Sequence, residues 1–229
     1  MNIPIKFRPN VRLMVLGVLA LYGCANAPKA PDWQLESKGA MNRTVAAYLE
    51  GNTRIEVAEM ARARSQLSRT GRADLLADAE LLRCATRVAS LVFEPCTGFE
   101  ALRPDTTEMQ RAYADYLRGQ LSPPSIPLLP AAQQSAASRN VGDATSLQGI
   151  EDPLSLLVAA AVLLETGKAN PATISQAVDT ASRQGWRRPL LAWLGVQLQS
   201  ATLAGQTAEV EGLKRRIQLI QTEAAAPPR

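Results

Sequence analysis

The sequence contains no histidine among its 229 residues. This absence excludes Ser-His-Asp and Cys-His catalysis and every metal site that uses imidazole ligands. The chain also lacks a glycine-rich phosphate loop and an acidic calcium loop. We therefore expect no cofactor, no metal site and no catalytic residues.

Aromatic residues are scarce, at 4% of the chain, whereas Ala and Leu are abundant. This composition favours helices over strands. The net charge of +4 comes largely from residues 1–23, which hold three basic residues and no acid. The remaining 206 residues carry 22 basic and 21 acidic side chains, so they give no compositional argument for binding nucleic acid.

Long apolar runs are also missing, and the one at the N-terminus is short. Lys6, Arg8 and Arg12 precede the apolar or small residues Leu13 to Ala20. A basic segment followed by such a run is typical of a secretory signal. The run falls far short of the roughly 20 apolar residues that a membrane span needs.

The signal ends in Leu21-Tyr22-Gly23-Cys24, which resembles the lipobox of bacterial lipoproteins. The resemblance implies that Cys24 becomes the lipidated first residue of the mature chain. In that family Asp after the cysteine retains the protein in the inner membrane, so Ala25 implies an outer-membrane anchor facing the periplasm. Several acyl chains anchor firmly, because each buried methylene contributes about 0.8 kcal/mol. The alternative is a soluble secreted protein cleaved nearby, for example after Ala27.

The mature chain is expected to be all-α, because apolar residues recur at helical spacing between turn residues. Gly119 to Gly149 interrupts this pattern with several prolines and a run of small polar residues, so we expect a connection there or an exposed functional loop. The resulting domain prediction is a signal peptide (1–23), a tether (24–32), an N-terminal helical subdomain (33–118), a Pro/Ser/Ala-rich connection (119–149), a C-terminal helical-hairpin subdomain (150–223) and a tail (224–229).

The C-terminal region is punctuated regularly. Pro153, Pro171 and Pro189 recur at intervals of 18 residues, and each is expected at the first position of a helix. Short turns between such helices favour antiparallel hairpins. A pair of helices spans 36 residues, and Trp193-Leu194-Gly195 loosely resembles part of a tetratricopeptide repeat. The expected architecture is antiparallel helical hairpins, arranged as an α-solenoid or as an irregular bundle.

With Cys24 assigned to lipid, Cys84 and Cys96 remain as a pair. An even pair in an exported chain predicts a disulfide. If a helix ends near Leu91, the five residues up to Cys96 reach about 16 Å, enough to return to Cys84. The bridge would contribute about 3 kcal/mol in the chain-entropy model.

Trp186 and Trp193 are seven residues apart, so they could lie on one side of a helix hairpin. One interpretation is a hydrophobic groove that binds a partner, as helical arrays often present. The other interpretation is packing within the core.

These features predict a lipid-anchored periplasmic scaffold that binds protein partners in an envelope assembly, for example secretion, pilus or cell-wall machinery. The alternative is an enzyme or binding protein that acts on cell-wall glycan through carboxylates, which requires two acids in one cleft and a raised pKa on one of them. A structural lipoprotein with no dedicated partner is a third possibility.

Overall fold

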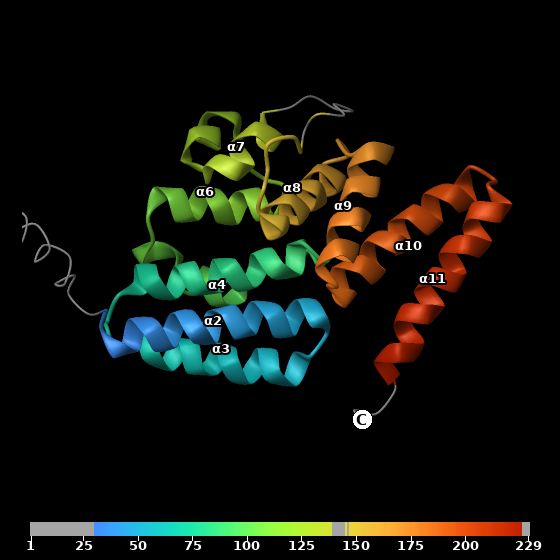
Figure 1. The fold of residues 1–229 in the computed structure, drawn as a ribbon. Helices are drawn as coiled ribbons and strands as arrows, with labels where there is room; N and C mark the ends of the chain where they lie inside the picture. Colours follow the sequence, from blue (N-terminus) through green and yellow to red (C-terminus); the bar gives the residue numbers. More distant parts are fainter. Residues whose placement is uncertain (1–29, 139–144, 146, 226–229) are drawn as a thin grey trace, which may run out of the picture. The chain divides into compact units, whose positions relative to one another are not determined.

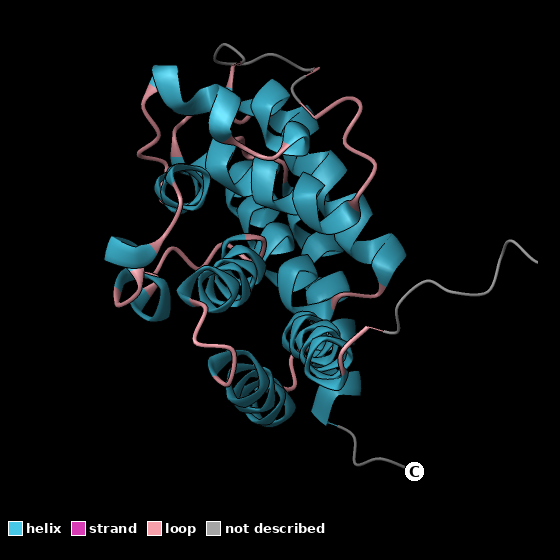
Figure 2. Ribbon diagram, turned by 90° about the vertical axis from the view of Figure 1, so that its left-hand side faces the viewer, coloured by secondary structure: helices cyan, strands magenta, loops and turns pink. Residues whose placement is uncertain are grey.

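The computed structural model describes residues 30–138, 145 and 147–225. Within these residues all regular secondary structure is helical, which confirms the all-α fold class (Figure 2). Asp32–Arg229 forms one compact unit. The predicted signal peptide, most of the tether and Cys24 lie outside the described residues. No described helix is both long and apolar enough to cross a bilayer.

The helices follow one another with short connections. Their bounds are α2 (Asp32–Glu50), α3 (Thr53–Ser68), α4 (Ala73–Val88), α5 (Thr97–Glu100), η2 (Arg103–Asp105), α6 (Glu108–Leu117), η3 (Pro123–Leu128), α7 (Ala131–Ala137), α8 (Pro153–Glu165), α9 (Pro171–Gln184), α10 (Arg187–Leu203) and α11 (Thr207–Ala225).

Helices α2 and α3 form the first antiparallel hairpin, and α4 packs against both of them (Figure 1). The turn between α2 and α3 depends on Gly51, whose φ of 91° lies in the left-handed region. Asn52 then caps α3, because its side-chain oxygen accepts a hydrogen bond from the Ile55 backbone N–H at 3.3 Å.

Helix α8 lies at the centre of the core. Every residue from Leu156 to Leu163 is buried, and the helix packs against α4, α6, α7 and α9. Asp152 caps it, and Pro153 occupies the first turn, where a missing N–H leaves no hydrogen bond unmade. The apolar run that the sequence offers here therefore forms a buried helix.

The segment 119–149 packs against this core where the structure describes it. It contains η3 and α7, and it buries Leu129, Ala136 and Leu147 in the same cluster of side chains that holds α4 and α8. The two regions that the sequence predicts as separate subdomains thus share one core. Prolines that rule out a long α-helix here are compatible with the short 3₁₀ helix η3.

Helices α9, α10 and α11 continue as antiparallel neighbours. Asn170 and Thr173 form a capping box at the start of α9, and Gly185 ends the helix in the left-handed conformation. Helix α10 begins at Arg187, so Pro189 is its third residue and not its first, as predicted. Helix α11 packs on α10, with Leu213 buried.

Cys84 and Cys96 lie at disulfide distance, with Cα atoms 5.9 Å apart, as predicted. The pair holds the start of α5 against α4. Beside it, the Glu80 carboxylate is only 2% exposed and pairs with Arg64 of α3. Gly98 packs so closely on this carboxylate that a Cβ at residue 98 would overlap the carboxylate atoms.

We therefore expect Gly98→Ala to lower the free energy of unfolding by about 1–3 kcal/mol, because the buried ion pair leaves Glu80 no room to move. Gly195→Ala is the matched control, since a Cβ there meets no atom within 4 Å and the residue lies inside α10. That change should be neutral or stabilising by up to about 1 kcal/mol. Urea denaturation measures both, and equal effects of the two substitutions would contradict the packing at Gly98.

Candidate functional site

One surface hollow lies between α2 and α4. It has a volume of about 270 Å³, and its wall is mainly apolar. The apolar side chains that line it are Trp33 and Met41 of α2, Leu67 of α3, and Leu75, Ala79 and Leu82 of α4. Leu75 and Leu82 are half-buried, so this face of α4 is left incompletely covered by its neighbours.

A second, larger hollow of about 510 Å³ lies between α4 and α6. Leu81, Met109 and Tyr113 give it apolar walls, and Met109 is 60% exposed. The two hollows adjoin, because Asp78 and Leu82 line both. We call them together the α4 groove. Its floor is α4, and its walls are α2 and α6, which pack on either side of that helix (Figure 1).

The floor of the α4 groove carries negative charge. Asp74 and Asp78 lie one turn apart on α4, on the same face as Leu75 and Leu82. Asp74 forms an ion pair with Arg72. Asp78 is exposed and accepts a hydrogen bond from Gln110 Nε2 at 2.6 Å. The groove therefore combines an apolar surface with an accessible carboxylate.

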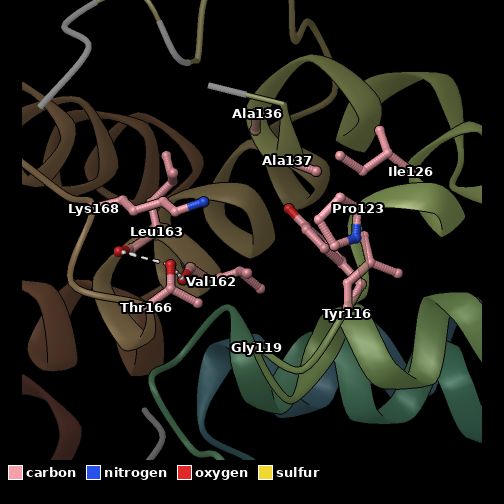
Figure 3. Close-up of a pocket in the computed structure, with 11 residues that line it drawn as sticks. Tyr116, Gly119, Pro123, Ile126, Ala136, Ala137, Val162, Leu163, Thr166 and Lys168 are labelled. Carbon is pink, nitrogen blue, oxygen red and sulfur yellow. Dashed lines mark hydrogen bonds between the residues drawn. The ribbon is translucent and has the colours of Figure 1, made fainter. Parts of the chain in front are cut away.

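A separate pocket of about 270 Å³ lies between α6, η3, α7 and α8, and we call it the α7–α8 pocket (Figure 3). Most of its lining is apolar, with Ile126, Ala137 and Leu163 on three sides. The Tyr116 hydroxyl donates to Gln133 Oε1 at 2.8 Å, so that polar atom is already satisfied. Lys168 is the charged residue among the described residues that line the pocket.

The most buried carboxylate belongs to Glu56 of α3, which is 1% exposed. Its Oε1 accepts hydrogen bonds from Arg83 Nε at 2.8 Å and from Arg87 Nη2 at 3.1 Å. Burial raises the pKa of Glu56, but the two arginines outweigh it and hold the pKa below its usual value. Arg87 also lies over the ring of Tyr48, 4.8 Å from the ring centre.

This arrangement of acids does not resemble a pair of glycosidase carboxylates. In the described part of the chain, each carboxyl group with a shifted pKa is shifted downward, because each is paired with a cation; they are Glu56, Asp74, Glu100 and Glu211. A general acid needs the opposite shift. The described residues also contain no group of three or more acids and cysteines placed to hold a metal ion.

The structure corrects the surface role predicted for Trp193. Its side chain is fully buried, and the indole Nε1 donates to the Ala89 carbonyl at 3.1 Å. The seven-residue spacing places Trp193 inside the helix contact because α10 also packs toward α4, which no local pattern reveals. Trp186 precedes α10 and is half-buried against the same core.

Sequence reasoning missed the α4 groove altogether. The signal that could have identified it is the spacing of Leu75, Asp78 and Leu82, which interrupts an apolar face of α4 with one acid. The two apolar faces of this helix predict neighbours on both sides, and the structure places α2 and α6 there.

Together these features define an all-α protein of packed helical hairpins with an apolar, acidic groove. Comparison with protein-family models, curated proteins and solved structures finds no match to the chain.

We expect Glu56→Gln to lower the free energy of unfolding by about 3 kcal/mol at neutral pH, because Arg83 and Arg87 lose their buried partner. A carboxyl with a lowered pKa stabilises the fold above its unfolded pKa, and this contribution is lost as pH falls through the lower folded value. The difference between wild type and variant should therefore shrink below about pH 4.5.

Glu211→Gln is the control, because Glu211 pairs with Lys214 on the exposed surface of α11 and should contribute little. Chemical denaturation from pH 7 down to pH 3 measures both variants. A Glu56→Gln difference that stays constant or grows over this range would contradict the buried ion pair.

Proposed function

We propose that this chain is a lipid-anchored periplasmic scaffold that binds a protein partner of an envelope assembly through the α4 groove. The observation that carries the proposal is the groove itself, an apolar channel between α2 and α6 with α4 as its floor. Apolar side chains that remain accessible in such a channel are typical of binding surfaces.

The form of the groove favours a helix as its occupant. A helix laid along α4 could pack between α2 and α6, in the way that amphipathic helices bind grooves formed by other helices. Leu75, Leu82 and Met109 offer apolar contacts, and Asp78 would pair with a basic residue on the occupant. We infer that the partner contributes an amphipathic helix with a Lys or Arg at the edge of its apolar face.

Two further features support an envelope location. Leu21-Tyr22-Gly23-Cys24 resembles a lipobox, which implies a lipid anchor at Cys24 and the outer membrane as its site. Cys84 and Cys96 lie at disulfide distance, and disulfides form in oxidising compartments such as the periplasm. A chain tethered to the membrane through nine residues would present the groove near its surface, because Trp33 lines the groove and follows the tether.

In-cell photo-crosslinking tests the groove. A photoreactive phenylalanine derivative in place of Met109 should form a stoichiometric adduct with one envelope protein, because Met109 is exposed at the groove. The same derivative in place of Leu203 is the control, since Leu203 is 83% exposed and lies at the end of α10. Met109→Arg should abolish recovery of the partner, whereas Val57→Arg on the exposed face of α3 should not.

Equal adducts from Met109 and Leu203, or adducts with abundant bystanders alone, would contradict the scaffold proposal. Loss of the partner in both arginine variants would place the contact outside the groove.

Fractionation of the cell envelope tests the anchor separately. Wild-type protein should be recovered with the outer membrane, and Cys24→Ala should not, because the acyl chains can attach only to this cysteine. Cys84→Ser is the matched cysteine control and should remain in the membrane fraction. Recovery of Cys24→Ala with the outer membrane would show that another feature holds the protein there.

A further inference from the structure

The α7–α8 pocket combines an apolar wall with a single cation. Ile126, Ala137 and Leu163 belong to three different helical segments, η3, α7 and α8, and converge on one hollow. Its volume of about 270 Å³ is close to the lower end of ligand pockets, which begin at about 300 Å³. It is therefore large enough for a small ligand or for the end of a longer chain.

The position of Lys168 gives this pocket its chemical preference. Lys168 follows the C-terminus of α8, and Figure 3 shows its ammonium pointing toward the wall that carries Tyr116. The residue is half-buried, and no carboxylate is among the described residues that line the pocket. The favourable field at a helix C-terminus explains a cation here, but it does not explain an ammonium directed over apolar side chains.

The remaining polar groups of the pocket are satisfied internally. The Tyr116 hydroxyl donates to Gln133, and Thr166 Oγ1 donates to the Val162 carbonyl at 2.7 Å (Figure 3). In contrast, the Lys168 ammonium has three N–H donors and faces a low-dielectric surface, where a bound anion would gain most. An anionic group carried on an alkyl chain meets both requirements.

We propose that the α7–α8 pocket binds a carboxylate-headed alkyl chain, as in a free fatty acid, with its carboxylate on Lys168 Nζ and its chain against Ile126, Ala137 and Leu163. This site is separate from the α4 groove and does not depend on the proposed scaffold function. No bond is made or broken, so the pocket acts as a binding site alone.

Isothermal titration calorimetry with the whole mature chain tests the site, using decanoate, decanol and decyltrimethylammonium below their micelle concentrations. Decanoate should bind at least about tenfold more tightly than decanol, because a hydrogen bond to a charged group is stronger than one to a neutral group. Decyltrimethylammonium should bind most weakly, since it meets the ammonium with a like charge.

Two variants separate the head group from the chain. Lys168→Gln should lower decanoate affinity about tenfold and leave decanol affinity unchanged. Lys214→Gln is the matched control and should change neither, because Lys214 is an exposed residue of α11. Ala137→Phe should fill the pocket and abolish binding of decanoate and decanol alike.

Equal affinity for decanoate and decanol in the wild type, or no binding of either, would overturn the proposal. Decanoate binding that survives Ala137→Phe would also overturn it, because the ligand would then occupy another site.

Discussion

The carboxylate of Glu56 constrains the way in which the first helices meet. A carboxylate that is 1% exposed is stable in its charged form only if cations replace the water it has lost, and Arg83 and Arg87 of α4 do so. Arg87 also lies over the Tyr48 ring of α2, and Arg188 of α10 lies over the same ring at 4.1 Å. Four helices thus have their relative positions determined by one charged network, whose contribution is geometric specificity more than net stability.

The α4 groove follows from this arrangement. Because Arg83 and Arg87 direct one face of α4 toward α3 and α2, the face that carries Leu75, Asp78 and Leu82 is turned to the gap between α2 and α6. Helix α6 is held on the far side by Gln110, which donates to the Asp74 carbonyl at 2.9 Å and to Asp78. The polar contacts that position both walls thereby leave an apolar floor accessible between them, which is the condition for binding a partner's side chains.

Local patterns were sufficient to predict the helices, but not their exact ends or their contacts. Pro153 and Pro171 begin helices as predicted, since proline at a first turn is a local rule. The caps of α3 and α6 were each wrong: Asn52 replaces Thr53, and Thr107 with Gln110 replaces Asp105, because several neighbouring residues can cap equally well. Trp193 and the α4 groove depend on contacts between residues far apart in the sequence, and such contacts are invisible to periodicity.

The balance of charge illustrates the same limit. The chain beyond residue 23 is nearly neutral, which argues against a single strong electrostatic partner. Yet the two apolar hollows carry opposite local charges, with Asp74 and Asp78 on the α4 groove and Lys168 on the α7–α8 pocket. Net charge averages over sites that the fold keeps apart, whereas recognition depends on the charge beside each apolar surface. A cationic helix and an anionic alkyl chain could therefore bind the same neutral protein without competing.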